Sequence, residues 1–153
     1  MPWVDLIDET FIVAAPGELA AVVHDPQRWR SWWPGLQLAV FMDRGEQGVR
    51  WSVTGDLVGS AEIWLEPFGD GVVVHHYLRA DPTRPGSRTQ VVEGAPAALA
   101  RLADRIRRRH ALAWKRSVNA LKDELEAGRP PGTPRTGVKP TPEAAEPLTR
   151  EGD

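Results

Sequence analysis

The stretch that decides the fold lies late in the chain and reads PAALARLADRIRRRHALAWKRSVNALKDELEA, residues 96–127. Apolar residues and one histidine recur in it at steps of three or four, at Leu99, Leu102, Ile106, His110, Trp114, Val118, Leu121 and Leu125. That spacing is one face of an α-helix. Pro96 suits the first helical turn, and Gly128 followed by prolines suits the end. At ~1.5 Å per residue the helix is about 48 Å long, so it must cross a domain of this size.

Upstream of this helix, five stretches have the alternation and the β-branched residues of strands: 5–13, 36–42, 49–54, 57–65 and 72–78. The links between the last four are short and contain turn residues, for example Asp43-Arg44-Gly45 and Thr54-Gly55-Asp56. Short links between successive strands predict an antiparallel meander. A further short strand is predicted at 88–92, after the interruption by Pro85 and Gly86.

Two short helices are predicted between the first and second strands. The first begins at Ala15-Pro16-Gly17-Glu18, and the second begins at Asp25-Pro26, an N-cap followed by proline. The second helix carries Trp29, Trp32 and Trp33 and ends at Pro34-Gly35. The predicted order is therefore strand, two short helices, strand meander and long helix, which is an α+β fold.

Length and composition exclude several classes of protein. The 153 residues suit one domain, and a net charge of −2 does not favour nucleic-acid binding. The absence of cysteine excludes disulfide and thiolate chemistry and suits a cytoplasmic location. No apolar run approaches the roughly 20 residues that a membrane span needs. The predicted domain covers 1–127, and the Pro- and Gly-rich residues 128–153 are predicted to be a disordered tail. The Ala- and Arg-rich, Lys-poor composition suggests a bacterial source.

Three local motifs carry a resemblance to a known superfamily: FIVAAPGE at 11–18, DPQRW at 25–29 and WWPGL at 32–36. With the order of elements over residues 5–127, they resemble the helix-grip fold of the START-like (SRPBCC) superfamily, in its polyketide cyclase/dehydrase-like branch. In that fold a curved antiparallel sheet wraps a long C-terminal helix. The resemblance implies an apolar cavity between sheet and helix that holds a hydrophobic or aromatic small molecule, polyketide- or lipid-like. The superfamily includes cyclases and lipid carriers, so the fold alone assigns no function.

Alternation predicts which strand residues face the helix. The inward sets are Leu38, Val40 and Met42; Val49, Trp51 and Val53; Ala61, Ile63 and Leu65; and Val74, His76 and Leu78. An error of one residue in the last strand would exchange His75 and His76. The predicted ligand-binding residues are Val40, Trp51, Val53, Ile63, His76, His110 and Trp114.

His76 and His110 are the candidate catalytic residues. Each is either a hydrogen-bonded core histidine or a polar anchor for a ligand, and as a pair they could act as acid and base in a cyclisation or dehydration. Two histidines without clustered carboxylates make a poor metal site, so neither a metal nor a cofactor is predicted.

Three functions remain open from the sequence. The first is a carrier or sensor of a hydrophobic small molecule. The second is a cyclase- or aromatase-like enzyme that uses His76 and His110, or one of them with Tyr77 or Arg50. The third is an interaction module without ligand, in which Trp32 or Trp33 is exposed. The basic side chains of the long helix, Arg105, Arg107, Arg108, Arg109, Lys115 and Arg116, are interpreted as a solvated face. The oligomeric state is left open.

Overall fold

A computed structural model describes residues 2–127 of the chain. Its elements are β1 (Val4–Ile12), α1 (Pro16–Val23), α2 (Pro26–Trp32), β2 (Leu36–Asp43), a 3₁₀ turn (Gly45–Gln47), β3 (Gly48–Gly55), β4 (Leu57–Phe68), β5 (Gly71–Pro82) and α3 (Pro96–Glu126). The predicted order of strand, two short helices, meander and long helix is confirmed. The predicted tail, residues 128–153, lies outside the described residues, as does the predicted stop residue Gly128.

The five strands form one antiparallel sheet in the order β1-β5-β4-β3-β2. β2 to β5 are the predicted meander, and β1 pairs with β5, so the two strands that flank α1 and α2 lie at opposite edges. The strand predicted at 88–92 is wrong, because only Thr83 and Val91 form an isolated bridge there. Ser87 turns the chain instead, since its hydroxyl accepts hydrogen bonds from the main-chain N–H groups of Thr89 and Gln90.

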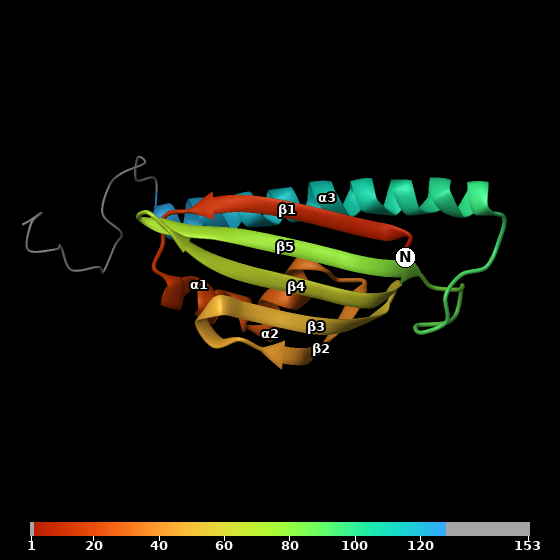
Figure 1. Ribbon diagram of the computed structural model, residues 1–153, viewed down its shortest axis with the longest axis horizontal. Helices are drawn as coiled ribbons and strands as arrows, with labels where there is room; N and C mark the ends of the chain where they lie inside the picture. The colour runs from red at the N-terminus through yellow and green to blue at the C-terminus, as the bar shows by residue number, and fades with distance from the viewer. Residues whose placement is uncertain (1, 128–153) are drawn as a thin grey trace, which may run out of the picture.

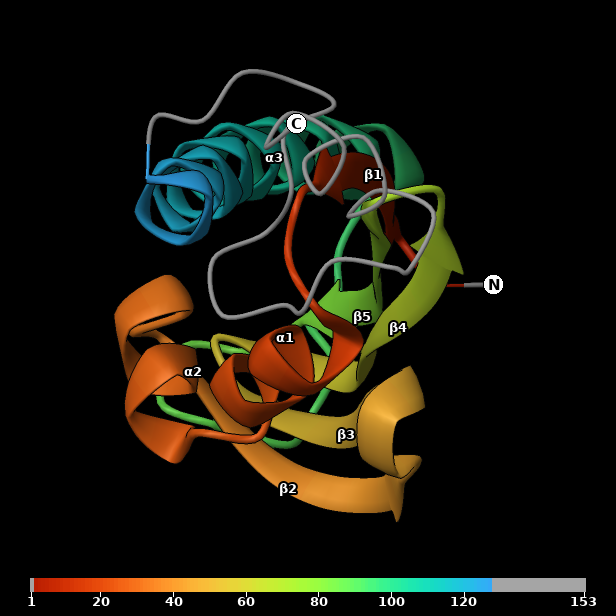
Figure 2. The ribbon, with the colours of Figure 1, turned by 90° about the vertical axis from the view of Figure 1, so that its left-hand side faces the viewer.

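The helices lie on one side of the curved sheet (Figure 2). α3 runs beside β1 along the long axis of the molecule, as its length predicts (Figure 1). α2 begins at its predicted N-cap, because the Asp25 carboxylate accepts a hydrogen bond from the N–H of Gln27. No helix within residues 2–127 has the length and apolarity that crossing a bilayer requires.

The core fills the space between the helices and the inner face of the sheet, the face that the helices cover. The inward sets predicted for β3, β4 and β5 are all buried, which confirms His76 as the inward histidine. The register agrees, since His76 pairs with Ile63 of β4 and with Asp8 of β1. His75 faces outward but is also buried, between Trp64 and Tyr77.

The prediction for β2 needs two corrections. Val40 pairs with Trp51 and shares its face, but it is 51% exposed, because β2 is an edge strand and α3 lies at the opposite edge. A β-bulge after Val40 shifts the register, so that Met42 pairs with Arg50 on the outer face. One residue of slip reverses the side to which a strand residue points, and alternation in the sequence does not show it.

Lys115, predicted as part of a solvated helix face, is exposed and also makes polar contacts with β1. Its Nζ lies 2.9 Å from Asp8 Oδ1 and 3.0 Å from the Thr10 hydroxyl, so it joins α3 to β1. At the end of α3, Lys122 pairs with Glu126 at 2.7 Å and donates to the main-chain oxygen of Phe11. These contacts fix the long helix against one edge of the sheet.

Candidate functional site

Six aromatic side chains gather on the inner face and form what we call the inner cluster: Trp29, Trp32, Trp33, Trp51, His76 and Trp114. They come from α2 and its C-terminal end, β3, β5 and α3. Trp33 lies at the centre, stacked on Trp114 at 5.5 Å and on His76 at 5.3 Å between ring centroids. Its edge contact with Trp51 is also 5.5 Å. The cluster thus joins helix and sheet through ring contacts.

The tryptophans of the α2 segment do not form an exposed surface. Trp32 is 6% exposed and Trp33 is 3% exposed, while Trp29 is half-buried. The prediction that Trp32 or Trp33 is exposed, on which the interaction-module function depended, is therefore wrong. Pro34 and Gly35 turn the chain into β2 directly after Trp33, which directs both rings into the core.

His76 is the titratable member of the inner cluster, and burial lowers the pKa of its imidazole to about 4. The ring is therefore neutral at pH 7. Its Nδ1 lies 3.3 Å from the main-chain oxygen of Glu62, a contact that places the proton on Nδ1. Nε2 is then a hydrogen-bond acceptor, and it has no partner among the described residues.

Trp51 has a hydrogen-bond donor without an acceptor among the described residues, as His76 has an acceptor without a donor. Its ring is fully buried, and the indole N–H has no acceptor within residues 2–127. Leaving a buried polar group unpaired costs about 1–3 kcal/mol, so native structures rarely keep one without a reason. Trp33 touches both the Trp51 ring and the His76 ring. An unpaired acceptor and an unpaired donor are therefore held beside the same indole.

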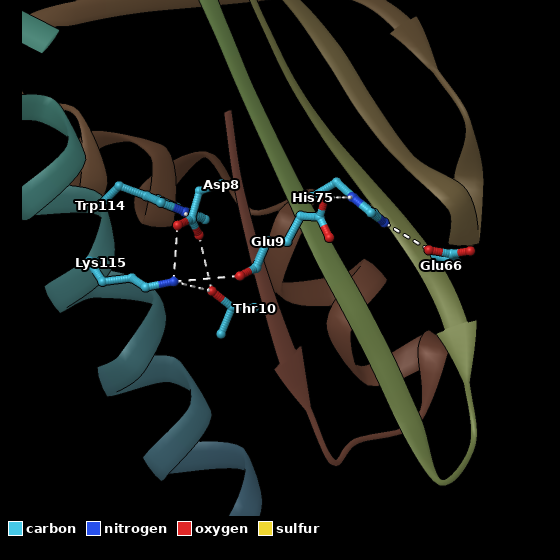
Figure 3. Close-up of polar contacts among 7 residues, drawn as sticks. All are labelled: Asp8, Glu9, Thr10, Glu66, His75, Trp114 and Lys115. Carbon is cyan, nitrogen blue, oxygen red and sulfur yellow. Dashed lines mark hydrogen bonds and ion pairs between the residues drawn. The ribbon is translucent and has the colours of Figure 1, made fainter. Parts of the chain in front are cut away.

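Asp8 lies beside the inner cluster, and the sequence analysis did not select it. Its carboxylate accepts hydrogen bonds from Trp114 Nε1 at 3.1 Å, from Lys115 Nζ at 2.9 Å and from the Thr10 hydroxyl at 3.0 Å (Figure 3). Figure 3 also shows His75 directed the other way, toward Glu66. A signal for Asp8 was present, since it follows Leu6 at the inward spacing of β1 and breaks an apolar pattern.

His110 is half-buried on α3, and burial, followed by the charge of Arg109, lowers the pKa of its imidazole. Burial is the main cause of the lowered pKa of His76, and a charge on His110 adds to it. Tyr77 and Arg50 lie on the outer face of the sheet, where both pair with Glu62. The structure therefore does not bring Tyr77 or Arg50 to the face of the sheet that carries His76. Among residues 2–127 no three His, Asp or Glu side chains gather as a metal site.

Two hollows of the described chain lie elsewhere. The larger, of about 690 Å³, is on the outer face of the sheet, over β3, β4 and β5. The smaller, of about 400 Å³, lies where the 83–95 loop meets β2 and the β3–β4 turn. Rings fill the inner face, where the sequence predicts a cavity. Trp51, Val53, Ile63, His76 and Trp114 are buried there, His110 is half-buried and Val40 is exposed; their role in binding stays a prediction.

A curved antiparallel sheet with a long C-terminal helix and two short helices between β1 and β2 is the helix-grip fold. Two solved structures share it. The Aha1 dimer from Colwellia psychrerythraea is 14% identical over 83% of this chain and 99% of its own, with a TM-score of 0.50. A protein from Deinococcus radiodurans is 13% identical over 81% and 98%, with a TM-score of 0.56.

A third comparison is weaker. The Zhui aromatase/cyclase from Streptomyces sp. R1128 is 11% identical over 84% of this chain and 98% of its own, with a TM-score of 0.45. No protein-family model matches the sequence, and no curated protein matches it significantly. At these identities the likeness concerns the fold alone.

Proposed function

We propose that the chain binds a hydroxylated hydrophobic or aromatic small molecule at the inner cluster, as an intracellular carrier or sensor. The observation that carries this proposal is a pair of nitrogens on one buried face, His76 Nε2 and Trp51 Nε1, that have no hydrogen-bond partner among residues 2–127. Both belong to rings in contact with Trp33. A protein that carries or senses a ligand needs such recognition groups and no catalytic set.

The chemistry of the two atoms selects a hydroxyl group. The neutral His76 imidazole offers Nε2 as an acceptor, and the indole of Trp51 offers an N–H donor. A hydroxyl both donates and accepts, so a ligand with hydroxyl substituents supplies what each atom lacks. Its apolar body would pack against indole faces, which favour flat rings. Pairing the two atoms removes a cost of about 1–3 kcal/mol each, and that gain contributes to affinity.

Access requires movement of rings, because the cluster is closed in this structure. Trp29 and His110 are half-buried, whereas Trp33, Trp51 and Trp114 are at most 3% exposed. The edge of the cluster at Trp29, its half-buried member, is therefore the side from which a ligand enters. Trp29 is held there by a hydrogen bond of 2.6 Å from its Nε1 to the main-chain oxygen of Val23. Opening would break that bond and turn the ring outward.

A cyclase-like enzyme is the second candidate, with the buried His76 and the half-buried His110 as its acid and base. With a pKa of about 4, however, His76 is a weak base at neutral pH. His110→Phe separates the two functions: an enzyme loses turnover of a cyclisable polyketide analogue while it still binds it, and a carrier keeps its affinity for the ligand.

Binding is tested with two probes that differ by one hydroxyl, 2-naphthol and naphthalene. The indole N–H signals of the ¹⁵N-labelled protein are followed by NMR, and the Trp51 signal is assigned from Trp51→Phe. We expect 2-naphthol to shift the Trp51 signal and to bind about tenfold more tightly than naphthalene, since one net hydrogen bond is worth about 1 kcal/mol or more. Trp51→Phe should remove most of this difference. Equal affinities, or an unmoved Trp51 signal at the solubility limit of 2-naphthol, would refute the proposal.

A further inference from the structure

The larger hollow lies on the face of the sheet opposite the inner cluster, so it is independent of the function proposed above. Its floor is the cross-strand pair Ser52 and Ser60, two small exposed side chains on β3 and β4. Larger side chains surround them: Arg50 and Glu62 in the next row of the sheet, and Arg79 beside Ser60 on β5. The hollow of about 690 Å³ exists because two serines lie among long side chains. Its size suits a small molecule.

The charges around the hollow are unbalanced. Arg44 and Arg50 share one carboxylate: Arg44 lies 3.2 Å from one Glu62 oxygen, and Arg50 lies 3.1 Å from the other. The Glu62 side chain is 14% exposed, so it orders both guanidinium groups while it neutralises only one. Arg79 adds a third guanidinium group, which forms an ion pair with Asp5 at 3.6 Å. Guanidinium donors remain free for an anion, and arginine suits a planar carboxylate.

Aromatic side chains complete the walls. The β-bulge places Phe41 at the rim, where it is 64% exposed. Trp64 lines the hollow and is backed by His75, whose ring stacks on it at 4.3 Å. Tyr77 lies in the same row as Arg50 and Glu62. Aromatic faces beside ordered arginines are the elements that bind a ring bearing an acid group.

We propose that this hollow is a second binding site, specific for small aromatic carboxylates. The carboxylate binds above Ser52 and Ser60, where the arginines supply charge and the serine hydroxyls supply hydrogen bonds. The ring packs against Tyr77. Glu62 acts as a positioning residue that holds Arg44 and Arg50 in place. Nothing in this site depends on the opening of the inner cluster.

The test uses 2-naphthoate as probe, with calorimetry on the full chain. We expect 1:1 binding that weakens at least fivefold between 50 mM and 500 mM NaCl, because salt screens exposed charges. Arg79→Gln should weaken binding at least fivefold, and Ser60→Ile, which fills the floor on an exposed face, at least tenfold. Arg116→Gln removes the same charge from an exposed position on α3 and should leave affinity unchanged. Circular dichroism checks that each variant is folded.

Three results would overturn the proposal: absence of binding at millimolar 2-naphthoate, equal losses in Arg79→Gln and Arg116→Gln, or unchanged affinity in folded Ser60→Ile. The second result would indicate attraction by net charge alone. The two sites are distinguished by His76→Phe, which should leave 2-naphthoate binding intact while it reduces 2-naphthol binding, because His76 does not line the outer hollow. Failure of one site therefore does not count against the other.

Discussion

Trp51 and Trp114 provide a matched pair of substitutions that tests the hydrogen-bond assignment of the inner cluster. Both indoles are buried, at 0% and 1% exposure, so Trp51→Phe and Trp114→Phe delete the same atoms from equivalent surroundings. They differ in one respect. The N–H of Trp114 donates to the Asp8 carboxylate at 3.1 Å, whereas that of Trp51 has no acceptor among the described residues.

The expected magnitudes follow from this difference. Loss of buried ring volume costs each variant about 2 kcal/mol. Trp114→Phe also loses a hydrogen bond to a charged group, about 1.5–3 kcal/mol, whereas Trp51→Phe removes an unpaired donor and recovers about 1–3 kcal/mol. Trp51→Phe should therefore leave the free energy of unfolding within about 1 kcal/mol of the parent. Trp114→Phe should lower it by about 4 kcal/mol.

Urea denaturation followed by circular dichroism measures both variants without relying on tryptophan fluorescence. With an m value of about 2 kcal/mol/M, a difference of about 3 kcal/mol separates the two midpoints by about 1.5 M. Equal destabilisation of the two variants would refute the reasoning, because it would mean that a bound water already satisfies the Trp51 N–H. That result would also remove the observation on which the proposed interior site depends.

Three further predictions concern the stability of the folded domain. The pKa of His76, about 4 when folded against an ordinary 6.5, means that the native state binds fewer protons than the unfolded chain. The free energy of unfolding is therefore highest above pH 6.5 and falls by about 3 kcal/mol between pH 6.5 and pH 4, as the unfolded chain takes up a proton that buried His76 does not. Urea denaturation across this range should show a smaller fall in His76→Phe than in the parent. Gly48→Ala should prevent folding or lower the thermal midpoint strongly, because φ is +120° and a Cβ would overlap the main chain of β4. Gly69→Asn should be tolerated, because Gly69 lies in an open turn with φ of +57°. Similar thermal midpoints for the two variants would contradict this. Asp25→Ala should cost about 1 kcal/mol in chemical denaturation through loss of the α2 N-cap, and no change would show that the cap is dispensable.

Part of the candidate site was accessible from sequence alone. Alternation in β5 placed His76 inward, and helical spacing on α3 placed His110 and Trp114 on the apolar face. The structure confirms that His76 and Trp114 are buried. Asp8 was missed although it breaks the inward apolar pattern of β1, because its partners Trp114 and Lys115 lie more than a hundred residues away in the sequence. The outer hollow was also missed, since Ser52 and Ser60 are inconspicuous in sequence and matter only as a cross-strand pair.

The sequence by itself determined the elements, their order and the antiparallel meander, because helical periodicity, alternation and turn residues act over a few neighbouring positions. Only the tertiary structure decided whether the inner face is open or filled, since that depends on how indoles from α2, β3 and α3 pack together. It also decided the side to which Met42 points and the sharing of Glu62 between Arg44 and Arg50. A bulge, a register and a packed ring arise from contacts between distant segments, and local pattern does not specify those contacts.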